Sequence, residues 1–120
     1  MVLKLNEPAF AYARNLVRDG KYVVDGRDAW SEHQPSTKQQ NEFIEQHGIG
    51  EYSRCHLGID DEMNPDRKTR YKFPYGDFES VHRCALLAAE SRAGQRKYYD
   101  IELAVAHLHG MLEALRDSSP

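Results

Sequence analysis

The apolar residues in the last third of the chain recur with the spacing of amphipathic helices. Apolar positions through residues 101–115 predict one helix that begins near Asp100. A broader apolar face over residues 78–89 predicts a preceding helix, which begins at the N-capping residue Asp77 and ends at Gly94. Because the connection between the two is short, we expect an antiparallel C-terminal helical hairpin.

The first half of the chain carries two further helix start signals. Asn6 can cap a helix whose first turn holds an acid and a proline, and Gly20 would end that helix. Ser36 and Gln39 have the spacing of a capping box, in which each side chain bonds the backbone amide of the other residue. The apolar positions that follow predict a second helix, which ends at Gly48.

Short stretches of extended character separate these helices. Residues 21–25 lie between two glycines and predict a short strand. Residues 52–59 and 70–73 could also pair as strands, and Pro74 would keep the second of them at a sheet edge because proline donates no backbone hydrogen bond. The remaining polar stretches are expected to be loops, at residues 26–35 and 60–68.

Together these patterns predict an α+β domain that is mainly α-helical. We expect four helices with a C-terminal helical hairpin and two or three short strands. At 120 residues the chain suits one domain, so we expect residues 1–116 to form a single globular domain and residues 117–120 to form a frayed tail.

Charge is distributed unevenly along the chain. The net charge is −3, but residues 67–97 hold eight basic and three acidic residues, a local charge of +5 that leaves −8 for the rest. Aromatic residues alternate with the basic ones over residues 70–76, a combination that suits phosphate contacts and base stacking. We therefore expect a basic face that binds an acidic protein or a nucleic acid through Arg67, Lys68, Arg70, Lys72, Tyr75, Arg83, Arg92, Arg96 and Lys97.

The same run has a structural interpretation. In an amphipathic strand, Tyr71 and Phe73 would face the core while Arg70 and Lys72 face water. A solvated basic edge of this kind also discourages edge-to-edge pairing between molecules. The basic and aromatic run therefore does not by itself identify a ligand.

Histidine and cysteine residues suggest the alternative of a small enzyme or a metal-binding protein. Cys55 with His56, and His82 with Cys84, offer four metal-ligand types in two places. Neither pair has the two-to-four-residue spacing of a zinc knuckle, and the chain has no His-Glu-x-x-His, nucleophile elbow, phosphate loop or dinucleotide fingerprint. We therefore expect reduced thiols, no metal site, no cofactor and no catalytic residue, and a protein that binds rather than catalyses.

One part of the chain resembles known proteins. Residues 71–78, followed by Val81, His82 and Arg83 and by residues 88–93, resemble a group of small bacterial proteins without assigned function. The same basic, aromatic and proline unit with its following helix also resembles helical units of phage-associated proteins. The resemblance covers about the last half of the chain and implies a compact helical module without catalytic residues.

Hydropathy bears on location. No apolar run approaches the roughly 20 residues that cross a bilayer, and the mean hydropathy is −0.76. The first residues have neither an apolar core nor a small-residue cleavage site of the secretory type. We expect a cytoplasmic protein that binds no membrane, and the sequence leaves its oligomeric state open.

Overall fold

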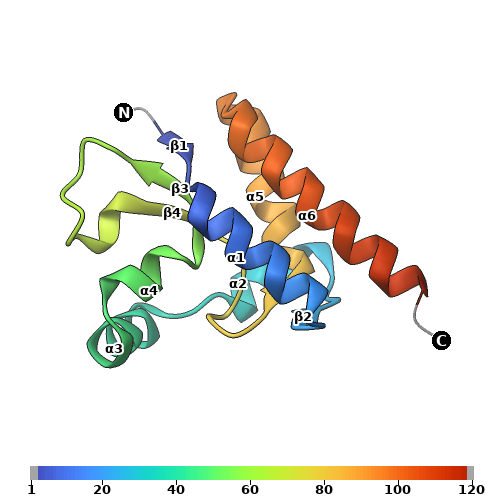
Figure 1. The fold of residues 1–120 in the computed structure, drawn as a ribbon, viewed down its shortest axis with the longest axis horizontal. Coiled ribbons are helices and arrows are strands. Elements are labelled where there is room, and N and C mark those ends of the chain that lie inside the picture. The colour runs from blue at the N-terminus through green and yellow to red at the C-terminus, as the bar shows by residue number, and fades with distance from the viewer. Residues whose placement is uncertain (1–2, 119–120) are drawn as a thin grey trace.

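The computed structural model describes residues 3–118, and the side chains of residues 3–116. It is a mainly helical α+β fold, as expected, but it has six α-helices within this range rather than four (Figure 1). The helices are α1 (Glu7–Arg18), α2 (Trp30–His33), α3 (Thr37–His47), α4 (Ile49–Ser53), α5 (Arg83–Arg96) and α6 (Tyr99–Ser118). The strands are β1 (Leu3–Leu5), β2 (Tyr22–Val23), β3 (His56–Asp60), β4 (Tyr71–Pro74) and β5 (Val81–His82), and short 3-10 turns cover Arg27–Ala29 and Lys68–Arg70.

The strands form two small sheets. In the first, β3 lies at the centre and pairs antiparallel with β1 and β4. Strand β4 is thus an edge strand, as Pro74 requires. In the second sheet, β2 pairs parallel with β5, so that Val23 lies opposite His82. The sequence analysis missed β1 and β5, and it missed the two short helices α2 and α4.

The core lies between helices α1, α5 and α6 and strand β3. Helices α5 and α6 form the expected hairpin, and both the hairpin and the sheet pack against α1 (Figure 1). The side chains at the centre of this core are fully buried, and they come from all four elements: Val17, Leu57, Leu86, Ile101, Val105, Leu108 and Leu112. Burying apolar side chains of this size is the main stabilising term in a domain of this length.

Helix α5 begins six residues later than expected. The carboxylate of Asp77 does accept backbone amides, from Glu79 at 3.0 Å and Ser80 at 2.9 Å, but these bonds close a turn and not a helix. Phe78 within that turn has a φ of +78°, which no helical residue adopts. The helix therefore starts at Arg83, after β5.

Gly94 does not end α5, contrary to expectation. The helix continues to Arg96, and Lys97 caps its end in the left-handed conformation with a φ of +62°. A Cβ at position 94 would lie 2.5 Å from a carboxylate oxygen of Glu102 on α6. A side chain at position 94 would therefore displace the Glu102 carboxylate, which lies against the glycine.

The C-terminal helix α6 runs to Ser118 and so enters the segment expected to fray, residues 117–120. Residues 119–120 lie outside the described residues, and the expectation for this tail remains a prediction. Within residues 3–118, no helix has both the length and the apolar character that crossing a bilayer requires.

No apolar residue within residues 18–51 is buried. Helix α3 starts with the expected capping box, since Gln39 N donates to Ser36 Oγ and Ser36 N donates to Gln39 Oε1. The helix is attached through the ring of Phe43, which stacks on Phe78 with centroids 4.3 Å apart. Because apolar burial does not hold this long segment, polar contacts must contribute strongly to its position.

Candidate metal centre

Four potential metal ligands from three separate segments meet at the start of α5. Asp25 follows β2, His33 ends α2, His82 ends β5, and Cys84 lies in the first turn of α5. Their ligand atoms all lie within 4.8 Å of one another. The parallel pairing of β2 with β5 brings Asp25 beside His82 and Cys84, and α2 carries His33 back over the start of α5. We call these four residues the Asp25 cluster.

The Asp25 carboxylate contacts each of the other three residues of the Asp25 cluster. Its Oδ2 lies 2.7 Å from His82 Nδ1, 2.8 Å from His33 Nδ1 and 3.0 Å from Cys84 Sγ, and its Oδ1 accepts the backbone amide of Cys84 at 2.7 Å. Burial raises the pKa of the carboxyl, but the hydrogen bonds from Cys84, His82 and His33 outweigh burial and hold the pKa of Asp25 well below its ordinary value. Asp25 is therefore an anion within the cluster.

His82 lies between two carboxylates. Its Nδ1 faces Asp25, and its Nε2 lies 2.8 Å from Asp77 Oδ2. Burial lowers the pKa of this imidazole, but the bonds to Asp77 and Asp25 outweigh burial, so the pKa of His82 is raised. A carboxylate on the far nitrogen of a metal-binding histidine orients the ring and raises its basicity, and Asp77 is placed to do this.

Cys84 is buried, and its thiol points at the Asp25 carboxylate. Burial and the hydrogen bond to Asp25 raise the pKa of Cys84 to about 12. A thiolate 3.0 Å from a carboxylate would be strongly disfavoured unless a cation lay between them. The position therefore does not suit a free nucleophilic cysteine, but it suits a cysteine that releases its proton to solvent when its sulfur binds a metal ion.

The donor set fits a tetrahedral Zn²⁺ ion. One carboxylate oxygen, two imidazole nitrogens and one thiolate sulfur are all zinc ligands, and the two anions balance the charge of the ion. At zinc bond lengths, neighbouring tetrahedral ligand atoms lie about 3.3–3.8 Å apart. Cys84 Sγ and His33 Nδ1 are already 3.8 Å apart, and the three contacts of Asp25 Oδ2 at 2.7–3.0 Å would need to lengthen by less than about 1 Å.

The Asp25 cluster is open to solvent on one side. The His33 side chain is 38% exposed, whereas those of Asp25 and His82 are about nine-tenths buried, at 9% and 8% exposure. The ring of Trp30 lies over this region with its centroid 6.4 Å from that of His82. A metal ion could therefore enter past His33, while the other three ligands are shielded.

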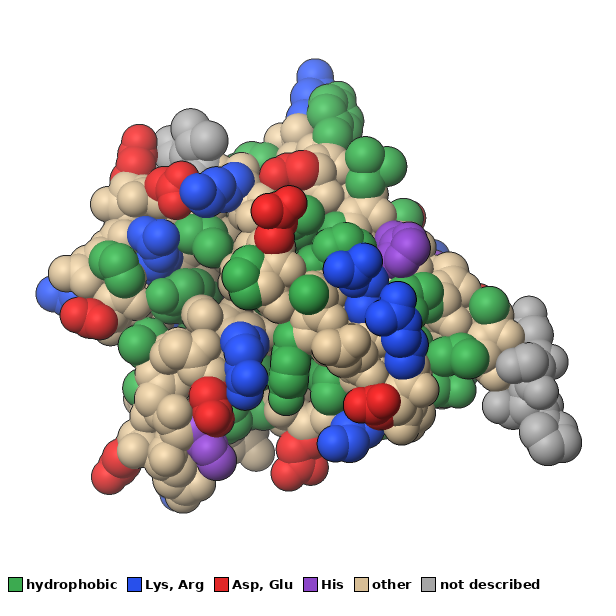
Figure 2. Space-filling view, viewed as in Figure 1, with side chains coloured by type: hydrophobic (Ala, Val, Ile, Leu, Met, Phe, Trp, Pro, Cys, Tyr) green, Lys and Arg blue, Asp and Glu red, His purple; other side chains and the backbone are tan. Residues whose placement is uncertain are grey.

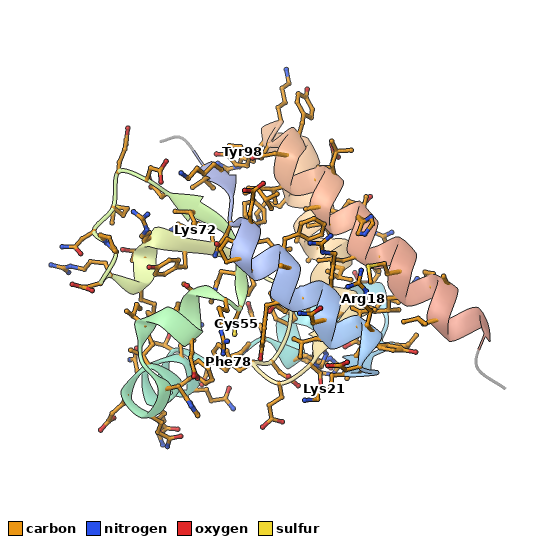
Figure 3. The ribbon with its side chains drawn as sticks, in the orientation of Figure 1. Arg18, Lys21, Cys55, Lys72, Phe78 and Tyr98 are labelled. Carbon is orange, nitrogen blue, oxygen red and sulfur yellow. The ribbon has the colours of Figure 1, made fainter. Side chains whose placement is uncertain are left out.

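Cys55 and His56 do not join the other two residues that the sequence analysis grouped with them. His56 Nδ1 lies 2.9 Å from the Tyr52 carbonyl, and burial lowers the pKa of this imidazole to about 4. Burial likewise raises the pKa of Cys55 to about 12, and its thiol contacts the Glu51 carbonyl. Figure 3 places Cys55 near the middle of the view, in the region of Phe78. Both residues are buried structural groups.

The sequence analysis considered two of these four residues, His82 and Cys84, as candidate metal ligands, but it expected no metal site and did not connect Asp25 or His33 with them. Both missed residues lie in a polar stretch that was expected to be strand end and loop. Residues 81–82 form a strand that pairs with residues 22–23, and this pairing places Asp25 near His82. The sequence analysis assigned residues 81–82 to a helix and therefore could not expect this pairing.

Four of the nine predicted binding residues line one pocket, namely Lys68, Lys72, Arg92 and Arg96. The others lie elsewhere. Arg70 contacts Asp61, Arg83 pairs with Glu113, and the buried Tyr75 donates its hydroxyl to the Arg54 carbonyl, while Arg67 and Lys97 are exposed. On the face shown in Figure 2, basic and acidic side chains are interspersed. The structure therefore brings four of the nine predicted residues together at one pocket.

Comparisons with known proteins add no further constraint. No protein-family model, no curated protein and no solved structure matches this chain. The resemblance of residues 71–93 to small bacterial proteins therefore remains a prediction, and the geometry of the Asp25 cluster is the basis for assigning a function.

Proposed function

We propose that this protein binds one divalent transition-metal ion, with Zn²⁺ the best fit, through Asp25, His33, His82 and Cys84. The observation that carries the proposal is the convergence of four ligand atoms of the correct types within 4.8 Å, from three separate segments. Asp77 supports the assignment, because it occupies the outer position that carboxylates take behind metal-binding histidines. The proposal develops the alternative of a metal-binding protein that the histidines and cysteines suggested.

The ion would have a structural role. Four protein ligands complete a tetrahedral sphere, whereas catalytic zinc sites keep one position for water or substrate. No apolar residue within residues 18–51 is buried, and the Asp25 cluster joins the first part of this segment to β5 and α5. A metal ion there would fasten residues 25–33 to the helical hairpin by coordination, where apolar packing is lacking.

A cysteine-dependent enzyme fits the same residues less well. A nucleophilic cysteine is activated by a base or by a lowered pKa. The Asp25 carboxylate beside Cys84 has the opposite effect on the pKa of the thiol. The thiol would become a thiolate readily only with a cation bound, and the sulfur would then be a ligand and not a free nucleophile.

Metal content of single variants tests the proposal. The purified protein is stripped with a chelator, loaded with Zn²⁺ or Co²⁺, desalted and measured for bound metal and absorption. We expect one metal ion per chain and, with Co²⁺, a thiolate-to-cobalt charge-transfer band. Replacing the buried ligand (Cys84→Ser) should abolish the band, and replacing the exposed ligand (His33→Gln) should weaken binding about tenfold or more.

The matched control is Cys55→Ser, because Cys55 is the other buried cysteine and lies outside the Asp25 cluster. This variant should keep both the stoichiometry and the band. Wild-type protein that retains no metal, or a charge-transfer band that disappears with Cys55 and persists without Cys84, would contradict the proposal.

A further inference from the structure

A second site lies apart from the Asp25 cluster. It is a pocket of about 390 Å³ to which β4, α5 and the turn between α5 and α6 contribute, and we call it the Lys72 pocket. No residue of the Asp25 cluster lines it. Its lining combines four basic residues, Lys68, Lys72, Arg92 and Arg96, with the rings of Tyr52, Tyr71, Phe73, Tyr98 and His56.

The charge of the Lys72 pocket is not compensated. No carboxylate lines it, although the chain as a whole is acidic. Among the described residues, the charged groups of Lys72, Arg92 and Arg96 have no ion pair or side-chain hydrogen bond, whereas Lys68 contacts Asn41 at 3.1 Å. Three free cations around one pocket create a positive potential that favours an anionic ligand.

The aromatic rings of the pocket are held in place. Tyr71 donates its hydroxyl to the Pro65 carbonyl at 2.7 Å, and Tyr98 packs edge-on against Phe73 with centroids 6.1 Å apart. Both tyrosines are half-buried, so part of each remains accessible. In Figure 3, Lys72 on β4 and Tyr98 at the turn between α5 and α6 both lie in the upper half of the view.

We propose that the Lys72 pocket binds a nucleotide unit. Lys72, Arg92 and Arg96 contact the phosphate, and the base stacks on the accessible faces of Tyr71 and Tyr98. The volume is that of a small-molecule site, which suits one nucleotide and not the broad flat contact of a protein partner. The nucleotide can be free or part of a single strand, and these two sources present the same chemistry to the pocket.

Binding measurements on the purified protein, with and without added Zn²⁺, test this proposal. The probes are ATP, a short single-stranded oligonucleotide of mixed sequence, the same sequence as a duplex, and pyrophosphate, which has phosphate but no base. We expect ATP or the single strand to bind more tightly than pyrophosphate and the duplex. A free nucleotide is the source if ATP binds at least as tightly as the oligonucleotide, and a single strand is the source if the oligonucleotide binds more tightly.

Two double variants separate the pocket from general charge. Arg92→Gln with Arg96→Gln removes two positive charges from the pocket, and Arg67→Gln with Lys97→Gln removes two positive charges outside it. The pocket variant should lose about tenfold or more in nucleotide affinity, while the control should stay within about twofold. Tyr98→Leu should lose about fivefold or more for the nucleotide and should bind pyrophosphate like the wild type.

Three results would overturn the inference. They are the absence of binding by both ATP and the single strand, an equal loss of affinity in the two double variants, and pyrophosphate binding as tight as nucleotide binding with no effect of Tyr98→Leu. None of these results bears on metal binding at the Asp25 cluster, so the two proposals can fail separately.

Discussion

At the scale of single residues, different partners give similarly buried side chains different roles. His56 and His82 are both buried, but His56 faces a carbonyl and is neutral, whereas His82 lies between two carboxylates that favour its proton. Cys55 and Cys84 differ in the same way, since only Cys84 has a carboxylate and an imidazole within reach. The residue types were visible in the sequence, but the partners that decide between structural group and ligand were not.

His56 should make the fold sensitive to acid. Burial lowers its pKa to about 4 from an ordinary value of 6.5, so between these values the unfolded chain takes up a proton that the folded chain does not. Stability should therefore fall as pH drops from about 6.5 to about 4, by up to about 3 kcal/mol from this group. The measurement is the free energy of unfolding of metal-free protein across this range, for wild type and His56→Gln.

The difference in pH dependence between the wild type and His56→Gln isolates the contribution of His56 to stability. The raised pKa of His82 acts in the opposite direction, because its stabilisation is present below pH 6.5 and is lost as pH rises through the folded pKa, but it acts in both proteins. We expect the wild type to lose more stability than His56→Gln over the window. Parallel pH profiles would show that His56 is not buried as a neutral side chain.

At the scale of elements, the sequence predicted correctly those helices that are specified by neighbouring residues alone. The capping box at Ser36 and the apolar period of residues 101–115 both specify helices without help from the rest of the chain, and both are confirmed. The predicted start of α5 at Asp77 was wrong because an aspartate can cap a turn as well as a helix. The predicted helix end at Gly94 was wrong because α5 continues to Arg96, and Lys97 adopts the left-handed conformation that ends the helix.

The apolar face of α6 offers a direct test of the helical hairpin. Leu108 is fully buried in the core, whereas Leu103 on the same helix is 72% exposed. Leu108→Ala should destabilise the protein by about 2–5 kcal/mol, because it removes buried methyl groups and leaves a cavity. Leu103→Ala should change the free energy of unfolding by less than about 0.5 kcal/mol. Equal effects of the two substitutions in denaturant titrations would contradict this packing.

At the scale of the whole molecule, the core and the Asp25 cluster stabilise different parts of the chain. The core joins α1, β3 and the α5–α6 hairpin, and residues 18–51 contribute no buried side chain to it. The Asp25 cluster joins the first part of that segment to β5 and α5 through contacts between residues up to 59 positions apart in sequence. Contacts this distant have no local pattern, which is why the sequence predicted the hairpin but not the cluster.

Because the core and the Asp25 cluster hold different parts of the chain, a bound metal ion should stabilise only one of these parts. In the proposed zinc-bound state, coordination would hold the segment around Asp25 and His33 against the hairpin, and without the ion this segment depends on hydrogen bonds among partly exposed groups. The hairpin core needs no metal for its own packing. Metal should therefore affect local opening of residues 22–33 far more than opening of the core.

Amide hydrogen exchange of metal-loaded and chelator-stripped protein measures this directly, with Cys84→Ser as the control. The account predicts that removing the ion speeds exchange of residues 22–33 and of the first turn of α5 by about tenfold or more, since structural zinc contributes several kcal/mol to local stability. Exchange in the buried part of α6 should change little, and Cys84→Ser should exchange alike under both conditions. Identical exchange of residues 22–33 with and without Zn²⁺ in the wild type would contradict a metal centre that fastens this segment to the hairpin.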